Sequence, residues 1–215
     1  MIPLLKSTVV ACALLAPMVT TAQLTLGVRA GAAFPLGDLE EGRPVDERLA
    51  RAFPLEASVG WRLSPGVEVG LQGGYGIGSK ADGWTSDCSA TAGDCRVHLW
   101  TVAARGEVAT KMGDLLPFAA ATLGWEWEVE RWETSADNWE RTSRSGWLAG
   151  LEAGADLPIT EGLHLGGFVG ASVGQFGALS VTGETAGYGY EDAGQVPGPA
   201  LHGWLSIGLR GKFNL

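Results

Sequence analysis

The last fifteen residues of the chain, 201–215, alternate strictly between two kinds of side chain. Every second residue from Leu201 to Leu215 is apolar or glycine, whereas the residues between them include His202, Arg210 and Lys212. Successive side chains of a β-strand point to opposite faces, so this segment is predicted to be a strand with one apolar and one polar face. A soluble sheet can show this pattern, and so can a membrane barrel with its apolar face toward lipid.

The same alternation recurs along the chain and predicts eight strands. They are expected at residues 24–34, 53–63, 67–78, 97–109, 116–130, 145–157, 163–174 and 201–215. Long polar connections at 35–51, 79–96, around 135–140 and at 175–198 alternate with short ones at 64–66, 110–115 and 158–162. This pattern predicts an all-β, transmembrane, antiparallel up-and-down β-barrel with short periplasmic turns and long extracellular loops. An even number of strands would place both termini in the periplasm.

Aromatic residues of the apolar files fall near the ends of the predicted strands. Those expected at the outer ends are Phe34, Phe53, Tyr75, Trp100, Trp125, Trp127 and Trp147, and those at the inner ends are Trp61 and Phe213. Membrane barrels carry such aromatic belts where lipid meets water. Chance placement in a tryptophan-rich chain is the alternative, and the consistency of the positions favours a membrane barrel over a soluble sandwich.

Residues 1–22 have the features of a secretory signal. Lys6 provides a positive charge, residues 9–15 are apolar, and residues 20–22 are small, as at a cleavage site. We therefore expect a signal peptide at 1–22, a barrel domain at 23–215, and a location in the bacterial outer membrane. A lipid anchor on Cys12 is a second interpretation, but the apolar run before Cys12 is short and continues past it.

Charge and cysteine content restrict the kinds of partner and cofactor that are expected. The net charge of −9 argues against nucleic acid, which requires a basic surface. Without the signal, Cys88 and Cys95 remain, and an even count in an exported chain predicts a disulfide; a metal site is the alternative. Asp82, Asp87 and Asp94 lie in the same segment, but their spacing matches no calcium loop, and we predict no metal and no cofactor.

Many charged residues belong to the polar files and should point into the lumen. They are Arg29, Glu56, Arg62, Glu68, Arg105, Glu107, Glu126, Glu128, Glu152, Asp156, Arg210 and Lys212. A lumen of eight strands is only wide enough for side chains to fill it, so a ladder of interior ion pairs is expected. A narrow cation path is the alternative, with Glu126, Glu128 and Glu130 attracting a cation near the outer mouth.

Several segments resemble strands of the small OmpA/OmpX-like outer-membrane barrels, a superfamily that includes opacity-type adhesins. They are residues 24–34, 117–124 (PFAAATLG), 146–157 (GWLAGLEAGADL) and the C-terminal strand. The resemblance implies an eight-stranded barrel, assembly by the barrel-insertion machinery, and contact with outer-membrane lipid. Phe213 matches the inner aromatic position of the family, whereas the final Leu215 stands where an aromatic residue is usual.

Three function classes follow from these features. The first is a monomeric, non-enzymatic barrel that acts through its external loops in adhesion, surface interaction or envelope integrity, with an unidentified surface ligand. The second is a narrow channel for ions or small solutes. The third is a lipid A-modifying enzyme, for which His98 with nearby Asp94 is the candidate, although His98, His164 and His202 all lack the His-x-Ser pattern. The first class is the prediction.

Overall fold

The computed structural model describes residues 23–81, 94–135 and 138–215, and eight long strands dominate them. The barrel strands are β1 (Gln23–Glu40), β3 (Leu49–Ser64), β4 (Val67–Lys80), β5 (Asp94–Ala109), β6 (Leu116–Ser135), β7 (Asn138–Pro158), β8 (Leu163–Thr185) and β10 (Leu201–Asn214). Three short elements join them, namely β2 (Arg43–Pro44), the 3-10 turn η2 (Val45–Glu47) and β9 (Tyr188–Gln195).

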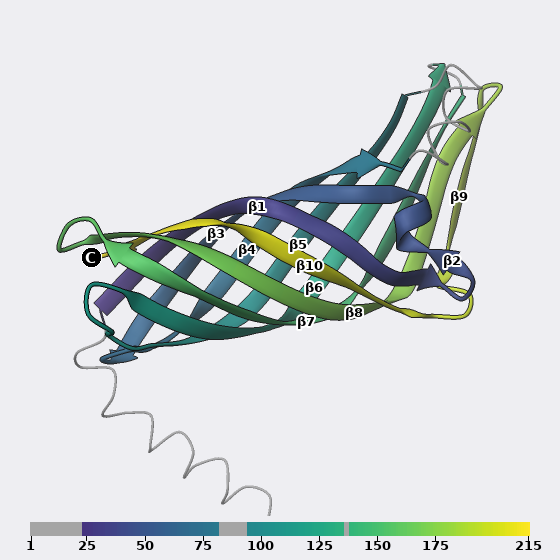
Figure 1. The fold of residues 1–215 in the computed structure, drawn as a ribbon. Helices are drawn as coiled ribbons and strands as arrows, with labels where there is room; N and C mark the ends of the chain where they lie inside the picture. Colours follow the sequence, from purple (N-terminus) through teal and green to yellow (C-terminus); the bar gives the residue numbers. More distant parts are fainter. Residues whose placement is uncertain (1–22, 82–93, 136–137) are drawn as a thin grey trace, which may run out of the picture.

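The barrel strands form a closed antiparallel ring (Figure 1). Each pairs with its neighbours in the chain, and β10 pairs with β1 from Thr25↔Asn214 to Gly37↔His202. This last pairing removes the free edges that an open sheet would leave, and a membrane barrel requires such closure. The predicted eight-stranded, all-β barrel is therefore confirmed.

The two ends of the barrel differ. At one end, which we call the turn end, β1 begins, β10 finishes, and the connections between strands are short. One of these connections is a tight turn in which Gly66 has a φ of +82°, a conformation that favours glycine. At the other end, which we call the extended end, strands β5 to β9 rise into a tall wall (Figure 1).

Much of the sequence predicted as long loops is strand. Residues 175–198 form a hairpin in which β8 and β9 pair from Ala178↔Gln195 to Thr185↔Tyr188. Ala186 and Gly187 close it with positive φ angles of 53° and 82°, as in the primed turns that suit hairpins. Likewise β6 and β7 stay paired as far as Ser135↔Asn138. Cross-strand hydrogen bonding here outweighs the glycine-rich and polar composition that suggested loops.

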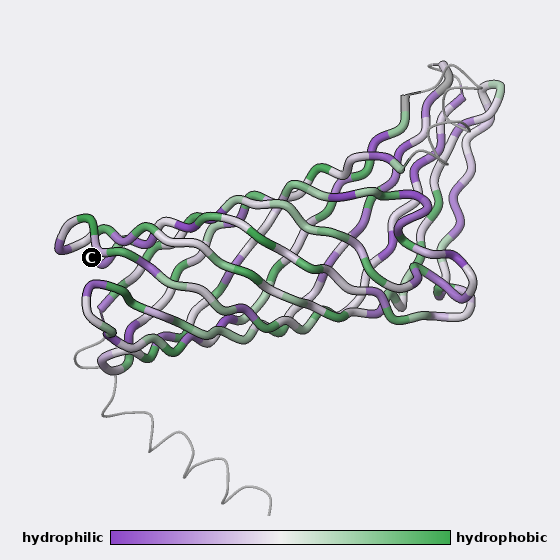
Figure 2. Tube along the Cα trace, in the orientation of Figure 1, coloured by the Kyte–Doolittle hydropathy of each residue, from purple (hydrophilic) through white to green (hydrophobic). Residues whose placement is uncertain are grey.

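The outward face of the barrel is apolar. Leu55, Leu123, Leu151 and Leu209 are 63%, 65%, 70% and 73% exposed, which is unusual for leucine in a water-soluble protein. Figure 2 shows apolar colour along the barrel wall and more polar colour in the extended-end wall. Within the described ranges, the structure contains no helix with the length and apolar character needed to span a membrane.

Buried apolar side chains gather inside the extended end. This outer plug contains Ala33, Leu39, Val45, Leu49, Ala52, Val97, Phe176, Val196 and Trp204. Leu39 lies at the end of β1, beyond the pairing with β10, while Val45 comes from the β1–β3 connection and Val196 from the chain after β9. The outer plug therefore covers this mouth of the barrel.

Candidate functional site

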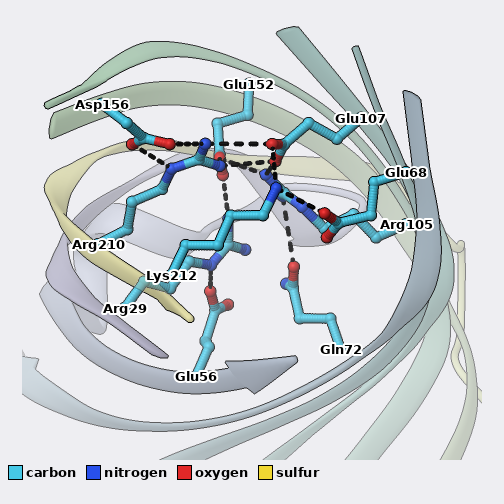
Figure 3. A network of polar contacts seen from close by, with 10 residues as sticks. All are labelled: Arg29, Glu56, Glu68, Gln72, Arg105, Glu107, Glu152, Asp156, Arg210 and Lys212. Atoms are coloured by element: carbon cyan, nitrogen blue, oxygen red, sulfur yellow. Dashed lines mark hydrogen bonds and ion pairs between the residues drawn. The ribbon is translucent and has the colours of Figure 1, made fainter. Parts of the chain in front are cut away.

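The lumen contains a dense network of ion pairs centred on Arg210 of β10 (Figure 3). Its guanidinium donates to both oxygens of Asp156, with Nε 2.8 Å from Oδ1 and Nη2 2.5 Å from Oδ2. It also donates to Glu107, where Nη1 lies 2.6 Å from Oε2. The same guanidinium lies 3.2 Å from the centre of the Phe118 ring. Charge, hydrogen bonds and a cation–π contact thus hold Arg210 in place.

Glu107 of β5 is contacted by three cations. Besides Arg210, Nζ of Lys212 lies 2.8 Å from Oε1 and Nη2 of Arg105 lies 3.0 Å from Oε2. Lys212 also reaches Oε2 of Glu68 at 2.6 Å. Because Glu107 is only 5% exposed, these contacts offset the cost of burying its charge.

The network continues along the lumen to Arg29 of β1. Arg105 donates to Oε1 of Glu152 at 2.8 Å, and Arg29 bridges Glu152 and Glu56. Gln72 adds a neutral acceptor, 3.5 Å from Nη1 of Arg105. We call this set the lumen network; its charged members are Arg29, Glu56, Glu68, Arg105, Glu107, Glu152, Asp156, Arg210 and Lys212.

Three of the predicted lumen residues lie outside this network. Arg62 is at the turn end, where Nη2 contacts Oδ1 of Asn214 at 2.6 Å. Glu126 and Glu128 belong to a second group nearer the extended end. The sequence placed all twelve residues on one ladder, whereas the structure separates them into a central network, a residue at the turn end and a second cluster.

This second group, the outer cluster, consists of Glu126, Glu128, Glu130, Arg144, Arg48 and His202. Arg144 lies 3.3 Å from Oε1 of Glu130 and 3.8 Å from Oε1 of Glu128. Arg48, just after η2, reaches Oε2 of Glu130 at 2.8 Å. His202 contacts Glu126 through Nε2, and its ring stacks on Phe176 at 4.2 Å. These carboxylates therefore face basic or histidine side chains rather than an open path for cations.

The free space inside the barrel changes along its axis. A funnel of about 460 Å³ opens at the turn end and is lined by Arg62, Lys111 and His164, among others. At the level of the lumen network the space falls to about 30 Å³, enough for only a few water molecules. A separate cavity of about 110 Å³ lies beside Glu126 and Trp204. The lumen network is thus a constriction between the funnel and this cavity.

Some members of these groups were not predicted from sequence. Arg144 is separated from Glu152 and Asp156 by even numbers of residues and so lies on the same face of its strand. Extending the predicted strand by one residue would have assigned it to the lumen. His202 lies on the polar file of β10, but nothing in the sequence pairs it with Glu126. Arg48 comes from a connection, and no periodicity indicates that it reaches into the barrel.

The aromatic residues predicted at strand ends all lie on the outward face. Toward the extended end, Trp100 is 51% exposed, Trp125 43%, and the register aligns Tyr75 with Trp100 and Trp100 with Trp127. Toward the turn end lie Trp61 and Phe213, which are 44% and 43% exposed. The remaining members of the outer set are Phe34, Phe53 and Trp147. Their role at a membrane interface remains a prediction.

The other predicted features are only partly described. Cys95 is buried, but Cys88 lies outside the described residues, and the disulfide stays a prediction. Asp82, Asp87 and the signal segment 1–22 also lie outside them. His98 faces outward and its Nδ1 lies 2.6 Å from the Tyr75 hydroxyl. Across the described ranges, no group of three His, Cys, Asp or Glu side chains is arranged to hold a metal ion.

Comparison with known proteins identifies similar structures but no similar sequences. No protein-family model matches the chain, and no curated protein matches it in sequence. The structure is similar to that of a major outer membrane protein from Thermus thermophilus, with a TM-score of 0.63 and 16% identity over 88% of this chain and 99% of that chain.

Two further solved structures are similar to the chain at lower TM-scores. Neisserial surface protein A (NspA) has a TM-score of 0.49 and 16% identity, over 86% of this chain and 95% of that one. Ail, the attachment invasion locus protein of Yersinia pestis, has a TM-score of 0.44 and 13% identity, over 88% and 98%. The barrel fold is supported by the closed ring of strands together with the similarity to the Thermus protein. An identity of 16% shows nothing beyond the fold.

Proposed function

We propose that the chain, whose described strands form a closed eight-stranded β-barrel, is a non-enzymatic outer-membrane protein of the small OmpA/OmpX-like kind that acts through its external surface. In this proposal the turn end and both termini face the periplasm, and the extended end faces the medium. The observation that carries it is the tall wall of β5 to β9, which stands above a lumen constricted by buried ion pairs.

The exposed tip of this wall supports a role in contact. Every residue of β9 is exposed, and Tyr188 is 81% exposed. The hydroxyl of Tyr190 donates to Glu140 at 2.9 Å, which links the hairpin to β7. Partial burial and this carboxylate raise the pKa of Tyr190. Exposed tyrosines on a paired strand can bind a partner at a low cost in conformational entropy.

The channel alternative has less support. Arg29, Arg105 and Arg210 cross the lumen to carboxylates on other strands, and the outer plug lies between them and the external mouth. Ions would have to displace these charged pairs, at a high cost in a poorly hydrated space. The test of this class is ion current across planar bilayers that contain the purified protein.

The enzyme alternative also has less support. His98 donates to, or accepts from, the Tyr75 hydroxyl on the outward wall, while His202 is 2% exposed beneath Phe176. A lipid-modifying base must reach a proton on its substrate, and only His98 is placed near the predicted outer leaflet. A lipid A mass shift on expression, abolished by His98→Ala, would support this class instead.

The proposal is tested by expressing the full chain in a Gram-negative host. Heat-modifiable migration on a gel reports the folded barrel, and protease added to whole cells should cleave the β8–β9 hairpin while sparing the short turns. Cells are then scored for settling and for attachment to polystyrene. We expect attachment to fall when Tyr188→Ser and Tyr190→Ser are combined.

Met112→Ser is the matched control, because Met112 is 67% exposed at the opposite end of the barrel. Attachment that is unchanged in the double tyrosine variant, currents in planar bilayers, or a lipid A mass shift would each contradict the proposal. Protection of the hairpin on intact cells would contradict its orientation.

A further inference from the structure

The outward wall carries a row of arginines just beyond the aromatic belt of the extended end. Arg96 of β5 pairs directly with Arg131 of β6, and Arg131 pairs with Arg141 of β7. All three are exposed, and in β3 Arg51 occupies a similar outward position. Among the described residues of the barrel strands, these four are the arginine and lysine residues of the outward files. We call Arg96, Arg131 and Arg141 the arginine row.

Such a row places like charges side by side. Side chains directly opposite on neighbouring strands have Cβ atoms roughly 5 Å apart, and like charges at this spacing repel. Glu133 relieves part of the repulsion, since its Oε2 lies 2.9 Å from Arg131. Glu133 and Glu184 on β8 lie further from the aromatic belt than the arginines do, whereas Glu191 of β9 lies level with the row, two strands beyond Arg141 through Thr182. None of these three glutamates lies on the belt side of the row, where an anion would lower the repulsion further.

The register fixes the height of the row. From Arg131 toward the barrel, the next outward pair is Val129 with His98, and the one after that is Trp127 with Trp100. Four residues of strand span roughly 13 Å, and less in height because barrel strands are tilted. Lipid headgroups occupy roughly 5–8 Å beyond the hydrocarbon, and arginine side chains can bend toward them.

A hollow connects the arginine row to the belt. It has a volume of about 300 Å³, with the three arginines above and Tyr75, His98 and Trp100 below. The lower side is fixed by local contacts: the Tyr75 ring stacks on His98 at 5.7 Å and lies 4.6 Å from the ring of Trp100. An aromatic surface with cations above it suits a ligand that has a phosphate group and an attached sugar or glycerol.

We propose that this hollow binds the phosphorylated headgroup of an outer-leaflet lipid. The arginine guanidiniums would donate paired hydrogen bonds to phosphate oxygens, while the acyl chains run down the apolar wall beside Val102 and Trp125. The inference rests on the proposed membrane location, because lipid must surround the outward wall. It adds a ligand class and a position that the loop-based function does not require.

The test uses the full chain, folded in detergent micelles and titrated with bisphosphorylated lipid A while native mass spectrometry counts bound lipid. We expect the triple variant Arg96→Gln/Arg131→Gln/Arg141→Gln to weaken binding by roughly tenfold or more, since each arginine contributes a charge-assisted contact. The lipid affinity of the corresponding triple lysine variant should lie between those of the unsubstituted protein and the glutamine variant. Lysine keeps the charge but cannot donate the paired hydrogen bonds of a guanidinium. Arg43→Gln/Lys111→Gln is the control, with both cations exposed away from the hollow.

Each outcome decides one part of the inference. Equal lipid A affinity in the glutamine variant, with heat-modifiable folding retained, would overturn the site. Equal binding of dephosphorylated lipid A would overturn the role of phosphate. Displacement by inositol hexakisphosphate at matching concentration would assign the site to a soluble phosphate instead of a lipid. Because the assay does not depend on cell-surface exposure, its failure is distinguishable from a failure of the proposed function.

Discussion

Arg210 and Glu107 meet across the lumen, with Nη1 of the arginine 2.6 Å from Oε2 of the glutamate, although 103 residues separate them in the chain. Their strands, β10 and β5, are not neighbours in the sheet. The pair therefore ties opposite walls of the barrel together. Such contacts link strands on opposite sides of the lumen, whereas backbone hydrogen bonds link only neighbouring strands.

Glu107→Gln should destabilise the barrel by about 3 kcal/mol, because it removes a buried negative charge that three cations share. The measurement is urea unfolding of the protein refolded in lipid vesicles. Glu161→Gln is the control, since Glu161 is exposed in a short turn. If the two variants unfold at the same urea concentration, the lumen network does not stabilise the fold.

Phe176→Ala should cost about 3–5 kcal/mol, the usual loss when a buried phenylalanine leaves a cavity. Phe176 is 0% exposed and stacks on His202 within the outer plug. Phe34→Ala is the comparison, since Phe34 is 45% exposed on the outward face. Unfolding of both variants is followed in the same vesicles, and a larger loss for Phe34→Ala would show that the outer plug adds little.

Gly146→Ala should lower the folding yield and the stability, by roughly 1–3 kcal/mol. A Cβ at Gly146 would lie 2.6 Å from the Gln175 carbonyl carbon and 2.7 Å from Cα of Phe176, both backbone atoms that cannot move easily. In Gly106→Ala the new methyl group meets nothing within 4 Å, so that variant should be neutral or slightly more stable. Heat-modifiable gel migration quantifies the folded fraction of each, and equal yields would refute the steric argument.

Leu209→Arg tests whether the outward face meets lipid. Leu209 lies four residues from Phe213 and four from Leu205, which pairs with Phe34, so it is midway between the two aromatic belts. An arginine at mid-membrane should cost about 2–4 kcal/mol, falling to at most about 1 kcal/mol near an interface. Leu201→Arg is the matched control, because Leu201 lies level with the outer belt, in register with Trp147 through Gln175. Similar small effects in both would argue that the wall does not contact hydrocarbon.

The sequence allowed the barrel to be predicted because each strand shows its two faces in its own residues. Residues such as Leu205, Ile207 and Leu209 alternate with Ser206 and Gly208, and a tertiary partner is not needed to see this. The extension of β8 and the presence of β9 could not be read in the same way. Their strand structure depends on mutual pairing, and their glycines and polar residues show no clear apolar file.

The sequence predicted which residues face the lumen, but not which of them contact one another. Parity assigns Arg29, Glu107 and Arg210 to the interior, whereas the choice of partner depends on the stagger of eight strands around the ring. Arg48 is a stronger case, because its contact with Glu130 depends on how the β1–β3 connection folds inward. The arginine row likewise emerges only when the register places three separate strands side by side.

The last strand contributes Arg210, Lys212 and His202 to the interior, and their acidic partners Glu107, Asp156 and Glu126 come from strands made earlier. Until β10 docks onto β1 and β8, Glu107 lacks Arg210 and Lys212, Asp156 lacks Arg210, and Glu126 lacks its contact with His202. Docking of β10 therefore closes the barrel and pairs these interior charges in the same step. The ion pairs formed at that step stabilise the docked strand.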